Sequence, residues 1–273
     1  MYKKNITPEQ AHDLLVSAYT NKKFIGDRLL VYNENILAAF INQNIDGIDS
    51  NIVEAVGIPR LDRYFRLKSR GNNIIFFSFY LEDKLRHLNL PEDVLKDYIE
   101  RGEKFHIEVL KYAHSNPGQK MVIKVKNNIR YLNYVKKIAE ENGYSDLKNL
   151  VITNTGNVYD HIKNSFAVIG YNSTALLESF IAGRLVMSPD FRDGVIRDFF
   201  DGYPGLANYV ETMEDIENVI ARAKSFSIDS EELNSLLHDR IYIPDGKACK
   251  RTEKSILNTI DMVRKHAGSM KTC

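Results

Sequence analysis

A turn of four polar residues is the part of this sequence whose residue types are best suited to chemistry. It follows a short apolar run, Phe166 to Ile169, with a glycine at the join, and it leads directly into a predicted helix from Ala175 to Ala182. The first backbone amides of a helix lack partners within the helix, and the helix dipole favours negative charge beside them. We therefore expect the turn to bind a phosphate or diphosphate; its residues are Tyr171, Asn172, Ser173 and Thr174.

A glutamate one helical turn further on extends this interpretation. Glu178 follows Thr174 by four residues, so the two side chains occupy neighbouring positions on the helix surface. A carboxylate there can accept hydrogen bonds from the hydroxyls of a ribose while the helix N-terminus holds the phosphates. Two simpler interpretations stay open: Ser173 or Thr174 only caps the helix, and Glu178 is an exposed helix residue.

Two lysines at the end of an earlier apolar run could add positive charge to such a site. Lys124 and Lys126 are two residues apart at the end of a predicted strand from Met121 to Val125, which places them on the same face. A lysine at the carboxyl end of a strand would neutralise a departing diphosphate. The alternative is that both are solvated lysines at a strand edge, since lysines are usually exposed.

The remaining candidates for chemistry give weaker signals. Asp190 and Asp193 follow the last central strand, and one of their carboxylates could interact with a molecule that accepts a transferred group. Aspartates are also common in turns. The histidines on helical patterns have no partners at the spacing of metal ligands, so we predict no metal site. These histidines are His106, His114 and His238.

The elements that must position these residues alternate between strands and helices from residue 72 onward. The predicted strands are short and apolar, as buried parallel strands are: Ile74 to Phe79, Met121 to Val125, Leu150 to Thr153, Phe166 to Ile169 and Leu185 to Met187. The predicted helices are Pro91 to Ala113, Ile129 to Asn142, Val158 to Lys163, Ala175 to Ala182, Met213 to Lys224, Ser230 to Leu237 and Lys247 to His266. This alternation predicts an α/β fold with a Rossmann-like, doubly wound parallel sheet, in which ligands bind at the carboxyl ends of the strands.

The first 65 residues read differently and are predicted to be a separate, mainly helical segment. Thr7 and Pro8 mark a helix start, residues 24–32 hold a short strand, and residues 34–42 form a short helix. We therefore divide the chain into a segment over 1–65 and a Rossmann-like domain over 66–273.

The composition excludes several classes of protein. The 37 basic and 36 acidic residues give a net charge of +1, which does not favour nucleic acid as a partner. Cys249 and Cys273 form no disulfide framework or metal-binding spacing, which suits a reducing cytoplasm. No apolar stretch reaches the roughly 18 residues of a membrane span. We expect a cytoplasmic protein and leave open a peripheral position at the inner face of a membrane.

Four segments, in order, resemble the nucleotide-donor domain of GT-B glycosyltransferases. The run NSTALLESFIAGRLVMSP is similar to the donor-binding signature of the bacterial transferases that build surface carbohydrate, capsule and polyglycerol phosphate. GIPRLDRYF with IIFFSF resembles the linker that enters the first strand of this domain, and VIKVKNN resembles a strand that usually ends in Lys-x-His-Pro. PDGKACKRTEKSI resembles the closing helix start. The resemblance covers about residues 50–265.

The resemblance implies a transferase that uses a nucleotide-activated sugar or glycerol donor. The nucleoside diphosphate sugar or related donor and a saccharide or lipid-linked acceptor would be its partners, with no metal and no separate cofactor. It also implies that Ser78 occupies a position where backbone amides lie near the donor phosphates, the alternative being an ordinary turn residue. The loop with Asn154 and Thr155 would wrap the nucleobase, although this loop can equally be a turn with a cap at Asn157. Arg251 would contact phosphate or brace the helix start, where Asp245 could be the cap.

Two departures from the family keep other functions open. The family's histidine is missing after Lys126, and too few residues precede Gly57 to form an acceptor domain. The segment 1–65 would then be a partial acceptor-side segment with the linker or, equally, a small helical appendage of the main domain. A general base in residues 1–60 has only His12 and Glu34 as weak candidates. The chain could therefore be a non-catalytic nucleotide-binding subunit that needs a partner chain or an oligomer to supply the acceptor domain, or an enzyme similar to UDP-sugar epimerases.

Overall fold

The computed structural model describes residues 23–43, 45–85, 90–192, 198–206, 208–222 and 230–269. The chain divides into two compact units. Unit 1 contains the described residues of the range 67–229, and unit 2 contains those of the ranges 4–66 and 230–273. In the structure the long segment of unit 1 begins at Leu67. The predicted helix that begins at Thr7 lies outside the described residues.

Residues 230–273 group with the N-terminal segment, whereas the sequence placed them in the Rossmann-like domain. The reason is a set of contacts that no local pattern reveals. Asn33 Nδ2 donates to the backbone oxygens of Asp239 and Arg240, and Ser255 Oγ donates to Glu54 at 2.6 Å.

Unit 1 is built on a six-stranded sheet in which every neighbouring pair of strands is parallel. The strand order is β5-β4-β3-β6-β7-β8. The chain first builds outward from β3 to β5 and then returns to the other side of β3, so the winding direction reverses between β3 and β6. The strands are β3 (Asn73–Phe77), β4 (Met121–Lys124), β5 (Leu150–Thr153), β6 (Ser165–Gly170), β7 (Leu185–Pro189) and β8 (Asn208–Val210).

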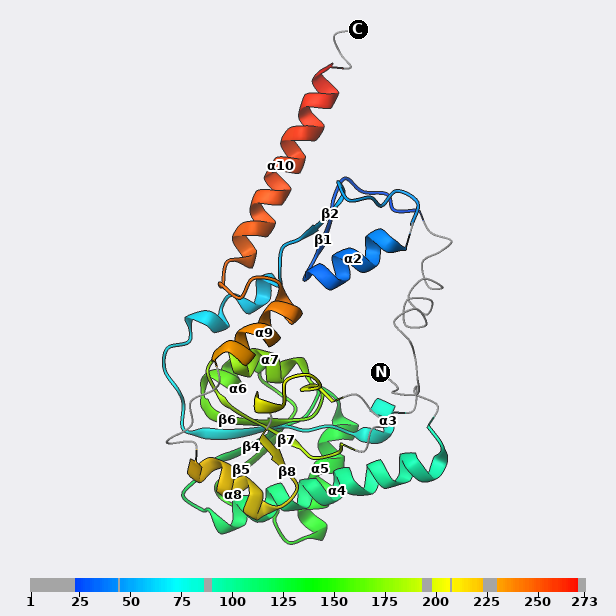
Figure 1. Ribbon diagram of the computed structural model, residues 1–273. Helices are drawn as coiled ribbons and strands as arrows, with labels where there is room; N and C mark the ends of the chain where they lie inside the picture. Colours follow the sequence, from blue (N-terminus) through cyan, green and yellow to red (C-terminus); the bar gives the residue numbers. More distant parts are fainter. Residues whose placement is uncertain are drawn as a thin grey trace. The chain divides into compact units, whose positions relative to one another are not determined.

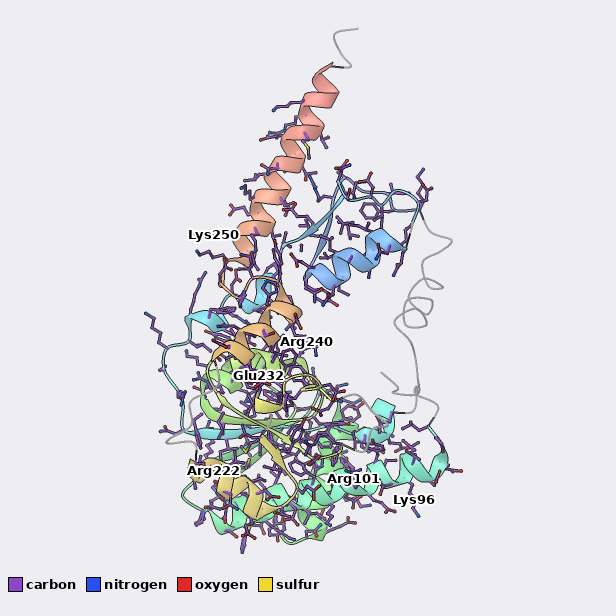
Figure 2. The ribbon with its side chains drawn as sticks, viewed as in Figure 1. Lys96, Arg101, Arg222, Glu232, Arg240 and Lys250 are labelled. Carbon is purple, nitrogen blue, oxygen red and sulfur yellow. The ribbon has the colours of Figure 1, made fainter. Side chains whose placement is uncertain are left out.

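Helices cover both faces of this sheet, as the predicted doubly wound fold requires. Figure 1 shows α4, α5 and α8 on one side and α6 and α7 on the other. The helices of unit 1 are α3 (Leu81–Leu85), α4 (Glu92–Ser115), α5 (Ile129–Glu141), α6 (Val158–Lys163), α7 (Thr174–Ile181) and α8 (Met213–Arg222), with a short 3₁₀ turn, η4 (Pro204–Leu206). Figure 2 shows the side chains, including Lys96 and Arg101 on α4.

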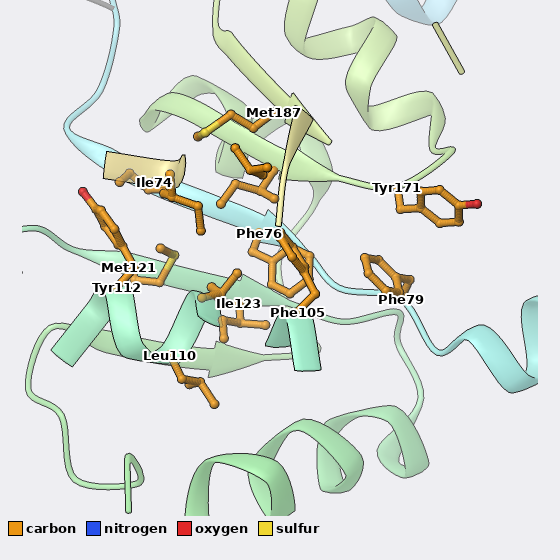
Figure 3. Close-up of a cluster of buried hydrophobic side chains, with 14 of the residues drawn as sticks. Ile74, Phe76, Phe79, Phe105, Leu110, Tyr112, Met121, Ile123, Tyr171 and Met187 are labelled. Carbon is orange, nitrogen blue, oxygen red and sulfur yellow. The ribbon is translucent and has the colours of Figure 1, made fainter. Parts of the chain in front are cut away.

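The core of unit 1 follows from the alternation of side chains along the strands. Ile74 and Phe76 of β3 face the side of α4, α5 and α8, where Phe76 meets Phe105 of α4 edge-on with ring centroids 5.6 Å apart (Figure 3). The alternate residues of this strand, Ile75 and Phe77, point to the opposite face of the sheet and are also buried. The apolar runs are therefore continuous because both faces of the sheet are covered.

Unit 2 contains a small parallel pair of strands with a helix between them. The strands β1 (Leu29–Val31) and β2 (Val53–Ala55) are joined through α2 (Glu34–Asn42), whose bounds are those predicted from the sequence. The other elements are η1 (Pro59–Leu61), η2 (Tyr64–Arg66), α9 (Ser230–Ile241) and α10 (Ala248–Ser269).

The N-terminus of α10 is capped by a residue far away in the sequence. The Asp62 carboxylate is 5% exposed and accepts hydrogen bonds from the backbone amides of Ala248 at 3.0 Å and Cys249 at 2.8 Å. Asp245, the cap suggested by the sequence, accepts a hydrogen bond from the amide of Lys247, one residue before the helix, at 2.9 Å. Within the described residues, no helix has both the length and the apolar character needed to cross a lipid bilayer.

Candidate functional site at the switch point of the sheet

The carboxyl ends of β3 and β6 lie next to each other where the winding direction reverses. Phe77 of β3 pairs with Gly170 of β6, so the residues that follow both strands emerge side by side. In open α/β sheets this switch point is where ligands bind. It brings together five of the predicted site residues: Ser78, Tyr171, Asn172, Ser173 and Thr174.

The turn after β6 has the backbone of a helix entry. Asn172 adopts a left-handed conformation with φ of +43°, which asparagine tolerates better than most residues. Ser173 is the N-cap of α7: its Oγ accepts from the amide of Ala175 at 3.3 Å. Thr174 is exposed at the first helical position. The capping interpretation is therefore confirmed for Ser173, and a cap at this position is compatible with an anion at the same helix end.

The backbone at Asn172 gives a prediction about stability. Asn172→Ala and Asn172→Gly both remove the side-chain amide, but only alanine places a Cβ in the left-handed region. We expect the alanine variant to be less stable than the glycine variant by about 1 kcal/mol. At most backbone positions the alanine variant is the more stable of the two. Thermal unfolding of the two variants measures this difference. A more stable alanine variant would contradict the left-handed turn.

Glu178 is buried within α7 and is only 2% exposed. The interpretation of Glu178 as an exposed helix residue is therefore wrong. Its neighbours from Ala175 to Phe180 are buried as well, because α7 packs against β6 and β7. A carboxylate in such a place needs hydrogen-bond donors to offset the loss of water.

Lys124 is buried at the carboxyl end of β4 and is 8% exposed, so it is not a solvated edge lysine. Its Nζ donates to the backbone oxygen of Asn154 at 3.0 Å and to that of Val125. Burial lowers the pKa of this ammonium group because the charged form loses hydration. Lys124 thus ties the end of β4 to the loop after β5, whereas Lys126 is exposed.

The loop after β5 is held by its own hydrogen bonds. The amide of Thr155 donates to Thr153 Oγ1 at 3.1 Å, and His161 Nε2 donates to the Thr155 oxygen at 3.1 Å. Asn157 caps α6 by accepting from the amide of Asp160 at 2.8 Å, so the predicted Asn cap is confirmed. The nucleobase-binding role of Asn154 and Thr155 stays a prediction.

Ser78 has a partner that the sequence analysis did not identify. Its Oγ lies 2.8 Å from Nε2 of His106, a residue of α4 that is 0% exposed. The backbone amide of Ser78 donates to the Lys124 oxygen at 3.0 Å, within the sheet. The sheet therefore already uses this amide, and the expectation that backbone amides at this position lie near the donor phosphates stays a prediction. Ser78 and His106 are 28 positions apart in the chain and belong to different elements, so only the tertiary structure reveals this pair.

Asp190, after β7, forms an ion pair with Arg192 rather than standing open. Arg192 Nε donates to Asp190 Oδ1 at 2.8 Å, and Arg192 Nη2 donates to Oδ2 at 2.5 Å. These bonds lower the pKa of the Asp190 carboxyl. Arg192 also lies over the Tyr209 ring, 3.6 Å from its centroid. Asp193 lies outside the described residues.

Arg251 belongs to unit 2 and braces the start of α10. Nη1 donates to both carboxylate oxygens of Asp245, at 2.8 and 2.9 Å, and Nε donates to the Val56 oxygen at 3.0 Å. This is the bracing role that the sequence analysis offered as an alternative to a phosphate contact. Among the described residues, no group of three or more His, Cys, Asp and Glu side chains has an arrangement that could hold a metal ion.

Solved structures share the fold at low sequence identity. One structure of the wall teichoic acid polymerase TagF, a variant soaked with CDPG, matches with a TM-score of 0.54 and 14% identity, covering 95% of this chain and 63% of that one. Another TagF variant matches with a TM-score of 0.52 and 15% identity, and the match covers 88% of this chain and 60% of that one. A UDP-N-acetylglucosamine 2-epimerase matches at 0.51 and 13%, covering 98% and 63%.

These matches support the α/β, Rossmann-like fold of the GT-B type. The chain spans about three-fifths of the length of these structures. No family model and no curated protein matches the sequence.

Proposed function

We propose that unit 1 binds a nucleotide-activated sugar or glycerol donor at the switch point, and that the protein acts as a GT-B-type transferase in bacterial surface-polysaccharide synthesis. The observation that carries this proposal is the turn 171–174, which leaves β6 beside the end of β3 and enters α7 through a left-handed residue and a serine cap. That geometry presents a helix N-terminus at the place where open α/β sheets bind nucleotides.

The comparisons support the choice of ligand class. TagF was solved with CDPG, and the epimerase carries a UDP-sugar in its name. The departing nucleotide would gain negative charge, which the first amides of α7 and the hydroxyls of Ser173 and Thr174 can offset. Under this proposal the acceptor is a saccharide or a lipid-linked acceptor.

Calorimetric titration of the full chain with UDP, CDP, GDP and CMP tests the proposal. We expect at least one of these nucleotides to bind with a dissociation constant below the millimolar range. No binding by any of them at millimolar concentration would overturn the proposal. Release of free nucleotide from a bound donor, with analysis of the sugar product, would separate a transferase from an epimerase, and turnover by the chain alone would exclude a subunit that depends on a partner.

Glu178 gives the sharpest residue-level prediction for this site. If its carboxylate accepts the ribose hydroxyls, Glu178→Gln should weaken nucleotide binding by about tenfold, the effect of losing a charge-assisted hydrogen bond. Calorimetry with the nucleotide that binds best measures this change. Glu141→Gln, an exposed glutamate at the end of α5, is the matched control and should bind as the unmodified chain does. Unchanged affinity together with a large loss of stability would show that Glu178 only supports the packing of α7.

A further inference from the structure

The pair formed by Ser78 and His106 has a proton arrangement that can be assigned from its partners. Nδ1 of His106 lies 2.7 Å from the backbone oxygen of Gly102, one turn earlier on α4. A carbonyl oxygen only accepts hydrogen bonds, so Nδ1 carries the proton. In a neutral imidazole the other nitrogen then has a lone pair. Nε2 therefore accepts, and the Ser78 hydroxyl donates its proton to it across 2.8 Å.

The neutral ring is favoured by its surroundings. Burial lowers the pKa of His106 to about 4 because the charged imidazolium would lose its hydration. Aromatic rings pack around the imidazole: those of Phe76, Phe79 and Tyr134 have centroids 4.9, 5.1 and 5.8 Å away. This packing and the bond to Gly102 fix the orientation of the ring, so the lone pair stays directed at Ser78.

Ser78 has therefore committed both of its hydrogen-bond donors within the protein. Its amide donates to the Lys124 oxygen and its hydroxyl donates to His106. A phosphate oxygen needs a donor, and Ser78 has none left to offer it. The lone pairs of the Ser78 oxygen remain, on a half-buried residue at the carboxyl end of β3. Such an oxygen can accept a hydrogen bond from a hydroxyl group.

We propose that His106 holds the Ser78 hydroxyl as a hydrogen-bond acceptor at the switch point, so that Ser78 binds a hydroxyl of the donor and not its phosphate. His106 is then a positioning residue, because the hydroxyl orientation that it sets determines which part of the ligand lies at Ser78. The phosphates would lie at the turn 171–174 and the N-terminus of α7, and a hydroxyl-bearing part would lie at the end of β3. This inference rests on the proposed function, because it assumes that a nucleotide-activated donor binds here.

The first test separates a hydroxyl contact from a phosphate contact. Calorimetry on the full chain uses inorganic pyrophosphate, the nucleoside diphosphates UDP and CDP, and the complete donors UDP-N-acetylglucosamine and CDP-glycerol. We expect Ser78→Ala to weaken the binding of a hydroxyl-bearing ligand by about tenfold, which is the effect of losing one neutral hydrogen bond. The affinity for pyrophosphate should change by less than about twofold. A loss for UDP or CDP assigns the hydroxyl to the ribose, whereas a loss confined to the complete donors assigns it to the transferred group.

Equal weakening of pyrophosphate and the hydroxyl-bearing ligands would overturn the inference, as would unchanged binding of all of them. Ser165→Ala is the matched control, because Ser165 is a buried serine at the opposite end of β6 whose Oγ donates to the Ile162 oxygen. It should leave every affinity unchanged. If the unmodified chain binds no nucleotide, the proposed function fails and this inference fails with it.

The second test examines His106 directly and does not depend on a ligand. Nitrogen-15 NMR of the imidazole in the full chain at pH 7 should show a neutral ring with the proton on Nδ1. A protonated ring, or a proton on Nε2, would overturn the inference even if nucleotides bind. Ser78→Ala should preserve the Nδ1 proton, since the bond to the Gly102 oxygen is independent of Ser78.

Discussion

The free energy of unfolding should fall by about 3 kcal/mol between pH 7 and pH 4 on account of His106 alone. The pKa of this residue is about 4 in the folded protein, against 6.5 for an unperturbed histidine. Between these values the unfolded state binds a proton that the folded state does not, so stability rises with pH over this window and is lost as pH falls through it. A difference of 2.5 units corresponds to about 3 kcal/mol.

Urea unfolding followed by far-ultraviolet circular dichroism at several pH values measures this loss. His106→Gln removes the titration, so its stability should fall less than that of the unmodified chain between pH 6.5 and pH 4. His114→Gln is the matched control for the loss of a histidine from this helix, because His114 lies on α4 with an exposed side chain. Parallel losses in the unmodified chain and His106→Gln would show that the imidazole is not held neutral.

Asp62→Ala should destabilise the start of α10 by about 2 to 3 kcal/mol. The substitution removes two charge-assisted hydrogen bonds and leaves the amide of Ala248, a buried residue, without its acceptor. It also removes a negative charge from the positive end of a 22-residue helix. Hydrogen exchange measured by mass spectrometry on peptides covering 248–265 should show faster exchange throughout the first turns.

Asp46→Ala is the control for this experiment. Asp46 also lies in unit 2, but its carboxylate is mostly exposed and forms an ion pair with the exposed Lys23 at 3.8 Å. Its removal should change stability by less than about 0.5 kcal/mol. Slow exchange in α10 of the Asp62→Ala variant would mean that packing, and not the cap, holds the helix start.

The elements that the sequence predicted well are those with strong local patterns. The strand 150–153 and the helices 34–42 and 158–163 have the predicted bounds, because apolar runs, Asn caps and helical periodicity are all local signals. The strand β8 was missed. It has three residues, Asn208–Val210, and only its pairing with β7 makes it a strand.

The candidate site shows the same division between local and distant signals. The turn 171–174 and its serine cap could be predicted, because strand, turn and helix follow one another in the chain. The partner of Ser78 could not be predicted, because His106 is 28 residues away in the chain. The acceptor of the Ala248 amide in α10 could not be predicted either, because Asp62 is 186 residues away. The burial of Lys124 and Glu178 likewise depends on elements that pack over them, which residue type alone does not reveal.

The division of unit 2 into two segments has a consequence for synthesis of the protein. Asp62 leaves the ribosome 186 residues before the amide that it caps. At about 5 to 20 residues per second, this interval lasts about ten to forty seconds. During that time the segment 67–229 of unit 1 is complete, whereas the hydrogen bonds of Asn33 and Glu54 with α9 and α10 can form only after residues 230–269 are made. A chain of which about the first 230 residues have emerged from the ribosome would thus hold the whole segment of unit 1 and an N-terminal segment that still lacks α9 and α10.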